Sequence, residues 1–206
     1  MIYISYDKRI NKRFKNKDKN LVVILFIMSK YKKKSMEELY RLDKEENKNA
    51  KKFPIKILLE DVRSMHNVGS CFRTSDAFQV EEIILSGLSP QPPHKEIHKT
   101  ALGATETVAW RSINDIYQEI EILKKEGYII LSLEQAHDSI PLNQYPFSSD
   151  EKYVFIFGHE VWGVQQDTIN ASHACIEIPQ FGTKHSLNIS VCIGITLWTA
   201  IQNYIS

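Results

Sequence analysis

Apolar positions in this chain fall into short continuous runs that alternate with segments of helical period. The runs predict strands at Ile55 to Glu60, Glu82 to Ser86, Tyr128 to Leu133, Tyr153 to Phe157 and Cys175 to Ile178. The periodic segments predict helices at Val68 to Phe78, Ile113 to Lys125, Gln165 to Ala171 and Ser190 to Tyr204. Buried strands that alternate with helices are typical of a mostly parallel sheet with helices on both faces. The pattern therefore predicts the α/β fold class.

The N-terminal part of the chain follows a different pattern. Residues 1–34 are rich in lysine and asparagine and show no sustained period, which predicts a basic, disordered extension. Ser35 followed by Glu38 is typical of a capping box and predicts a charged helix to about Asn49, with a linker to residue 53. Residues 54–206 are then the main domain. Met28 is a second possible translation start, so the sequence leaves open whether residues 1–27 belong to the native protein.

Composition narrows the class of protein. With 206 residues, of which 43% are hydrophobic and 25% charged, the chain can bury one core. The net charge of +1 hides a concentration of lysine and arginine in the first 56 residues. Cys71, Cys175 and Cys192 lie far apart, which predicts free thiols in the cytoplasm rather than disulfides or a zinc site. The longest apolar run, Leu21 to Met28, is far shorter than the roughly 20 residues of a membrane span.

The ends of the predicted strands carry the candidate chemistry. Ligands of parallel sheets gather where the strands end, and three exits are distinctive: Leu133-Glu134-Gln135, Phe157-Gly158-His159-Glu160 and Ile178-Pro179. Gly158 and Gly163 enclose a turn with a carboxylate at Glu160. The sequence has neither a Walker motif nor Gly-x-Gly-x-x-Gly, which disfavours a ligand held by its phosphates. We expect a ligand held by the main chain of three neighbouring loops.

Three motifs occur in order between Pro54 and Tyr204. They are Asn67-Val68-Gly69 with Arg73 and Asp76, then Phe157-Gly158-x-Glu160-x-x-Gly163, then Ile178-Pro179 through Gly182 to Ser186-Leu187-Asn188-x-Ser190. With these motifs the chain resembles the SpoU-type RNA ribose 2′-O-methyltransferases of the SPOUT superfamily. The resemblance implies a C-terminal trefoil knot, S-adenosylmethionine as cofactor, and transfer of its methyl group to a ribose 2′-hydroxyl of tRNA or rRNA.

The resemblance also implies roles for individual residues. The cofactor-binding positions are Leu133, Gly158, Ile178, Ser186 and Leu187, and the catalytic positions are Arg73, Asn67, Glu160, Ser186 and Asn188. A guanidinium stays protonated in proteins, so Arg73 is expected to orient the hydroxyl and bind an adjacent phosphate rather than act as a base. The identity of the proton acceptor stays open. Lys99 and Lys184, near the predicted loops, are expected to bind RNA phosphates.

Each of these residues also has a purely structural interpretation. Arg73 and the two lysines can be solvated charges, and Glu160 can bind amides of its own turn. Ser186 and Asn188 can be ordinary helix N-caps. His94 and His98 stand four apart without a third ligand, so no metal site is predicted. The tryptophans Trp110, Trp162 and Trp198 are expected in the core or in a dimer contact rather than as platforms for bases.

The closing helix predicts self-association. Its apolar residues, which are Ile193, Leu197, Trp198, Ile201 and Tyr204, exceed what one packing face requires, and this favours a homodimer through the helix. Two other functions stay open: a catalytically silent SPOUT homologue that binds RNA as an assembly factor, and an unrelated open-sheet enzyme. The sequence does not identify the RNA or the nucleotide, because RNA loops are recognised by scattered contacts.

Overall fold

The structure, a computed structural model, describes residues 32–35 and 37–205. The chain divides into two compact units, Met1–Arg41 and Leu42–Ser206. The first unit contains one described element, the 3₁₀ helix η1 (Glu37–Leu39). Most of the expected disordered extension, residues 1–34, lies outside the described residues, and the proposed domain limits at residues 34 and 53 stay predictions.

The expected helix from Ser35 to about Asn49 is wrong, because two short elements occupy this segment. Ser35 and Glu38 do exchange capping hydrogen bonds, yet they open only η1, and Tyr40 follows it with a φ of +44°. A second capping box, between Asp43 and Glu46, starts the helix α2 (Lys44–Asn49). The left-handed backbone at Tyr40 ends the first helical segment, and the chain needs a new cap to begin the second.

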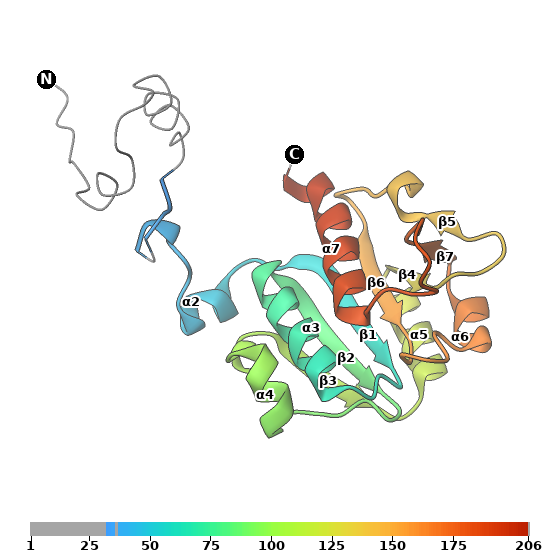
Figure 1. Ribbon diagram of the computed structural model, residues 1–206, viewed down its shortest axis with the longest axis horizontal. Helices are drawn as coiled ribbons and strands as arrows, with labels where there is room; N and C mark the ends of the chain where they lie inside the picture. The colour runs from blue at the N-terminus through green and yellow to red at the C-terminus, as the bar shows by residue number, and fades with distance from the viewer. Residues whose placement is uncertain (1–31, 36, 206) are drawn as a thin grey trace, which may run out of the picture. The chain divides into compact units, whose positions relative to one another are not determined.

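Seven strands form one sheet in the described part of the chain, and every pair in it is parallel (Figure 1). In chain order they are β1 (Phe53–Glu60), β2 (Val80–Ser86), β3 (Ala109–Ile113), β4 (Tyr128–Leu133), β5 (Ile140–Pro141), β6 (Lys152–Phe157) and β7 (Ala174–Glu177). The order across the sheet is β3-β2-β1-β6-β4-β7-β5. The predicted parallel α/β sheet is therefore confirmed. The two edge strands, β3 and β5, were not predicted, because β3 lacks a buried run and β5 has only two residues.

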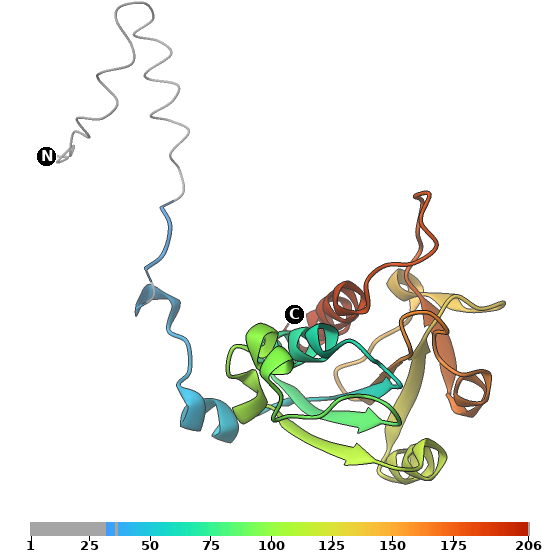
Figure 2. The same cartoon turned by 60° about the horizontal axis from the view of Figure 1, so that its bottom comes forward.

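Helices cover both faces of the sheet, as expected (Figures 1 and 2). On one face lie α3 (Met65–Ala77), α4 (Lys95–Ala101) and α7 (Ile189–Ile205), and on the other lie α5 (Ile116–Lys125) and α6 (Gln166–Ala171). Successive β1 residues alternate between the two cores: Ile57 and Leu59 pack with α3 and α7, and Leu58 packs with α5. The four predicted helices are present, whereas α4 was not predicted.

This arrangement places three loops side by side. Strands β6, β4 and β7 are neighbours in the sheet, with Ser132 opposite Ile156 and Leu133 opposite Ile176. Because the strands are parallel, their carboxyl ends meet at one edge. The trefoil knot stays a prediction, since strand order and register do not define how the loops thread. No helix within residues 32–35 and 37–205 combines the length and the apolar character that crossing a membrane requires.

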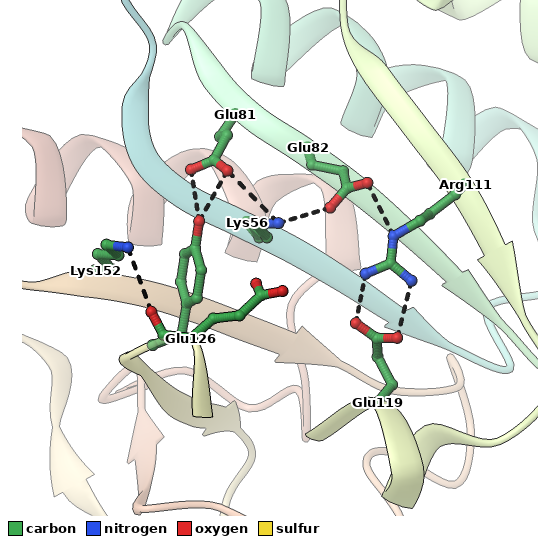
Figure 3. Close-up of polar contacts among 8 residues, drawn as sticks. Lys56, Glu81, Glu82, Arg111, Glu119, Glu126 and Lys152 are labelled. Carbon is green, nitrogen blue, oxygen red and sulfur yellow. Dashed lines mark hydrogen bonds and ion pairs between the residues drawn. The ribbon is translucent and has the colours of Figure 1, made fainter. Parts of the chain in front are cut away.

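A polar network joins the strands on the α5 side of the sheet (Figure 3). The Lys56 ammonium, on a residue only 9% exposed, lies 2.9 Å from Glu82 and 3.5 Å from Glu81. Burial alone lowers the pKa of Lys56, but the hydrogen bond and charge of Glu82 and the charge of Glu81 outweigh it, so the net pKa is raised. The Tyr128 hydroxyl donates to Glu81, and burial with this bond raises the pKa of the phenol. Lysine and tyrosine therefore both stay protonated.

The second half of the network ties α5 to the sheet. The Arg111 guanidinium donates through Nε to Glu82 at 3.0 Å and through both terminal nitrogens to Glu119 of α5. Glu119 is only 5% exposed, so its carboxylate depends on this arginine for compensation. The ion pairs of Arg111 with Glu82 and Glu119 thus hold α5 against β2 and β3.

We expect Arg111→Ala to lower the free energy of unfolding by about 2 kcal/mol, because it leaves the buried Glu119 carboxylate without its partner. Urea denaturation measures the change. Lys124→Ala, which removes an exposed pair with Glu121, serves as the control and should cost less than about 0.5 kcal/mol. The double change Arg111→Leu with Glu119→Leu should recover most of the loss, and a single variant as stable as the wild type would contradict this account.

Candidate functional site

A pocket of about 600 Å³ opens at the carboxyl ends of β4, β6 and β7. This volume suits a small molecule. The lining residues come from the three strand exits and the start of α7, and they are Leu133, Glu134, Gln135, Phe157, Gly158, His159, Glu160, Val161, Gly163, Ile176, Glu177, Ile178, Gln180, His185, Ser186, Leu187, Asn188, Ile189 and Cys192. All five residues expected to hold the cofactor, Leu133, Gly158, Ile178, Ser186 and Leu187, are among them. Their binding role stays a prediction.

Two glycines allow the loop after β6 to fold back on itself. A Cβ on Gly158 would lie 2.1 Å from the carbonyl carbon of Gly163, so main chain packs on main chain there. Gly163 has a φ of +68°, and a Cβ on it would lie 1.9 Å from a carboxylate oxygen of Glu134. That carboxylate accepts hydrogen bonds from the amides of Val164 and Gln135, at 3.0 and 2.8 Å. Glu134 thus holds the loop after β6 against the loop after β4.

The same loop reaches across to the start of α3. The Glu160 carboxylate accepts hydrogen bonds from the amides of Arg63 and Ser64, at 3.1 and 2.9 Å, and from the Asn67 side chain at 2.9 Å. The amides of Arg63 and Ser64 stand just ahead of the helix, where the helix dipole also favours an anion. The carboxylate therefore joins the loop after β6 to α3.

A further hydrogen bond links α3 to the loop after β7. The Asn188 side chain donates to the Asn67 side-chain oxygen at 3.2 Å. The Asn188 oxygen in turn accepts from the amide and hydroxyl of Ser190, at 2.8 and 2.5 Å, so Asn188 caps α7. The structure thus brings Asn67, Glu160 and Asn188 into one continuous chain of hydrogen bonds.

Glu160 is poised as a hydrogen-bond acceptor rather than as a base. Burial tends to raise its pKa, but the hydrogen bonds from Arg63, Ser64 and Asn67 outweigh burial and hold the pKa below its usual value. The structural interpretation of Asn188 as a helix N-cap agrees with its contacts, whereas Glu160 binds the amides ahead of α3 and not those of its own turn. Ser186 also lines the pocket, but it lies two residues before Asn188 and is not the cap of α7.

The pocket carries negative rather than positive charge. Among the described lining residues, Glu134, Glu160 and Glu177 supply carboxylates, and no lysine or arginine is present. Such a lining suits a cationic or neutral ligand better than a phosphate. Cys192 also lines the pocket, and because burial raises the pKa of its thiol, it is not activated as a nucleophile.

The basic residues of the predicted site lie outside the pocket. Arg73 is exposed on α3, six residues beyond Asn67 and so about 9 Å further along the helix axis, and it does not line the pocket. Lys99, on α4, is paired with Glu96 at 2.7 Å. Lys184 is exposed in the loop after β7, between the lining residues Gln180 and His185.

The remaining candidates lie elsewhere. His94 caps α4 through a hydrogen bond from the Glu96 amide. Trp110 packs edge-on against Phe72 in the core, with ring centroids 6.4 Å apart, and Trp198 is half-exposed beside Phe78. Trp162 is 81% exposed and therefore not a core residue of the chain. Sequence reasoning assigned no role to Glu134 and His159, although both stand directly at strand exits, which was the signal available.

Residues 54–198 match the family model described as SpoU rRNA Methylase family. The 23S rRNA (guanosine-2'-O-)-methyltransferase RlmB of Neisseria meningitidis serogroup B is 28% identical over 144 residues, which are 70% of this chain and 56% of that protein. The tRNA (guanosine(18)-2'-O)-methyltransferase of Thermus thermophilus is 27% identical over 144 residues, which are 70% of this chain and 72% of that protein. The chain thus spans little more than half the length of the rRNA relative.

Solved structures agree with these matches. The AdoMet bound rRNA methyltransferase from Sinorhizobium meliloti superposes with a TM-score of 0.69 and 26% identity, over 74% of this chain and 57% of that one. The A. aeolicus TrmH/SpoU tRNA modifying enzyme has a TM-score of 0.68 at 22% identity, over 75% of this chain and 77% of that one. The second likeness shows the fold alone.

The hydrogen bonds to Glu160 predict a pH-dependent contribution to stability. Its folded pKa is depressed, so the stabilisation is present above the ordinary value of 4.5 and is lost as the pH falls through the folded pKa. We expect Glu160→Gln to melt below the wild type at pH 7, with a difference that shrinks below about pH 4.5. Calorimetric melting between pH 3 and pH 7 checks this.

Glu177→Gln is the matched control, because Glu177 also lines the pocket but its side chain makes no hydrogen bond within residues 32–35 and 37–205. It should melt like the wild type across the range. If the melting temperature of Glu160→Gln lies below that of the wild type by the same amount at every pH, the charge of Glu160 contributes nothing to stability.

Proposed function

The chain belongs to the SpoU rRNA methylase family, and from that premise we propose that it transfers a methyl group from S-adenosylmethionine to a ribose 2′-hydroxyl of tRNA or rRNA. The observation that carries the proposal is the pocket lined by the second and third motif segments, to which Asn67 of the first motif is tied by hydrogen bonds with Glu160 and Asn188. One relative acts on 23S rRNA and another on tRNA, by their names, so both RNA classes stay in the proposal.

The pocket residues fit this cofactor. S-adenosylmethionine supplies a methyl group made electrophilic by a positively charged sulfonium. A lining with Glu134, Glu160 and Glu177, and without a described lysine or arginine, is suited to that charge. We assign the adenosine contacts to the main chain of Leu133, Gly158, Ile178 and Leu187, which all line the pocket. The solved relative from Sinorhizobium meliloti is AdoMet bound.

The chain from Glu160 through Asn67 to Asn188 has a positioning role in this proposal. It fixes the loops after β6 and β7 against α3 before any ligand binds, so little ordering remains to be done on binding. Ser186, next to the capped start of α7, is left facing the pocket, where its hydroxyl is available to the cofactor or to the ribose.

Arg73 is proposed to act on the RNA rather than on the cofactor. Its side chain is exposed, lies outside the pocket, and makes no hydrogen bond or ion pair with the described part of the chain. A free guanidinium can bind a phosphate in bidentate fashion and hold the neighbouring ribose in place. We assign further phosphate contacts to Lys99 and Lys184.

We also propose a homodimer through α7. Ile193, Leu197 and Ile201 of this helix are buried in the core, so they are not available to a partner. Another set of apolar side chains on the same helix remains 47 to 59% exposed, namely Val191, Trp198 and Ile205. Two copies can cover this surface in a symmetric contact. The three free cysteines support a cytoplasmic location.

The activity is tested with the purified full chain, methyl-labelled S-adenosylmethionine, and tRNA or rRNA from a strain that lacks the gene. We expect one 2′-O-methylated nucleoside to appear on mass spectrometry in one RNA class. Calorimetric titration with the cofactor is run in parallel. RNA binding without any cofactor binding would favour the catalytically silent alternative and overturn the proposal.

Arg73→Lys should lower turnover at least a hundredfold while leaving the affinity for S-adenosylmethionine unchanged, because lysine cannot make the bidentate contact. Single-turnover methyl transfer and cofactor calorimetry separate the two effects. Arg41→Lys, at another exposed arginine, is the control and should behave as the wild type. Retained turnover in Arg73→Lys would refute the role of Arg73.

A further inference from the structure

Trp162 is a large apolar side chain held out in solvent at the mouth of the pocket. It is 81% exposed, and its neighbours Val161 and Gly163 line the pocket while Trp162 itself does not. Indoles are rarely left this exposed without a partner, because they carry a large apolar surface. The side chain therefore requires an explanation that the core does not provide.

The turn that carries Trp162 is rigid. The amide of His159 donates to the Gly163 carbonyl at 3.0 Å, and the Gly163 amide donates back at 2.8 Å. Within the turn, Nδ1 of His159 accepts hydrogen bonds from the amides of Val161 and Trp162, at 2.9 and 3.4 Å. The turn satisfies its own amides, so the backbone that carries the indole is ordered before binding, which lowers the entropic cost of binding.

The chemistry around the indole favours a flat, polar-edged partner. The His159 ring lies 6.2 Å from the indole at a tilt of 31°, and Glu160, two residues before Trp162, is ionised and anchored to α3. An aromatic face beside an imidazole and a carboxylate is an arrangement on which an unpaired nucleobase stacks, and the neighbouring Val161, 71% exposed, adds apolar surface to it. The opposite loop, after β7, also carries an exposed aromatic residue, Phe181, which is 97% exposed.

Trp162 stands beside the pocket, because its sequence neighbours on both sides, Val161 and Gly163, line it. A base stacked on Trp162 would hold the attached or neighbouring ribose at the mouth of the pocket.

We propose that Trp162 is a positioning residue that stacks on an unpaired base of the RNA substrate and so delivers the target ribose to the pocket. The inference rests on the proposed function and goes further, because it assigns single-stranded or looped RNA as the form that the site accepts. Stacking is tolerant of base identity, so Trp162 sets the position of the nucleotide and leaves the choice of base to other contacts.

The test compares the full chain with Trp162→Ala, Trp162→Phe and the control Tyr117→Ala, an exposed aromatic on α5 over the other face of the sheet. Methyl transfer to RNA from the deletion strain is measured at varied RNA concentration. Trp162→Ala should raise the KM for RNA about tenfold or more, change kcat less than about threefold, and leave cofactor affinity unchanged. Trp162→Phe should have a KM for RNA close to the wild-type value, and Tyr117→Ala should leave the KM unchanged.

A second measurement does not depend on turnover. Titration of the wild type with an adenine oligoribonucleotide of about eight residues should quench tryptophan fluorescence, and the quenching should be largely absent from Trp162→Phe. If the wild type methylates no RNA, the proposed function fails, while this quenching still decides whether Trp162 stacks on bases. Three outcomes would each overturn the inference. They are an unchanged KM for RNA in Trp162→Ala, fluorescence quenching in Trp162→Phe equal to that of the wild type, and a Trp162→Ala variant that sediments as a monomer where the wild type is a dimer.

Discussion

The carboxylate of Glu160 and the side-chain amides of Asn67 and Asn188 hold the site together. Glu160 accepts hydrogen bonds from the main-chain amides ahead of α3 and from the side chain of Asn67. The Asn67 side-chain oxygen accepts a hydrogen bond from Asn188, which caps α7. These bonds connect three segments that are distant in sequence, so the pocket is pre-formed rather than assembled around its ligand. The carboxylate stays ionised because its hydrogen bonds outweigh its burial. This link fixes the loops after β6 and β7 on α3, while Glu134 separately holds the loop after β6 against the loop after β4.

Charge is distributed so that the two proposed ligands are kept apart. The pocket presents carboxylates and main chain, which suit a cationic nucleoside, whereas Arg73, Lys99 and Lys184 lie outside it. A phosphate chain would be repelled from the pocket and attracted to its surroundings. The methyl donor and the RNA would thus meet only at the mouth, where the exposed Trp162 stands. The network of Lys56, Arg111 and Glu119 lies on the α5 side of the sheet and joins α5 to β2 and β3.

The accuracy of sequence reasoning followed the strength of the local signal. The strands around Ile57, Ile84 and Val154 are buried on both faces, so their continuous apolar runs were unmistakable. The edge strand β3 has no such run, and its sequence does not predict a strand, because β3 is extended through its hydrogen bonds to β2. The helix expected from Ser35 failed for the opposite reason: its capping box was real but local, and the left-handed Tyr40 ended it.

By itself, the sequence determined five of the strands, four of the helices, the parallel α/β class, the three motif segments and the three strand exits that line the pocket, because each depends on local periodicity or on residue type at a strand exit. Only the tertiary structure decided which side chains face one another. Glu160 contacts Asn67 across 93 positions, and Asn67 contacts Asn188 across 121, and no periodicity encodes such a pairing. It likewise decided that Arg73 stands outside the pocket and Trp162 in solvent, because exposure is a property of how the layers pack and not of the residues alone.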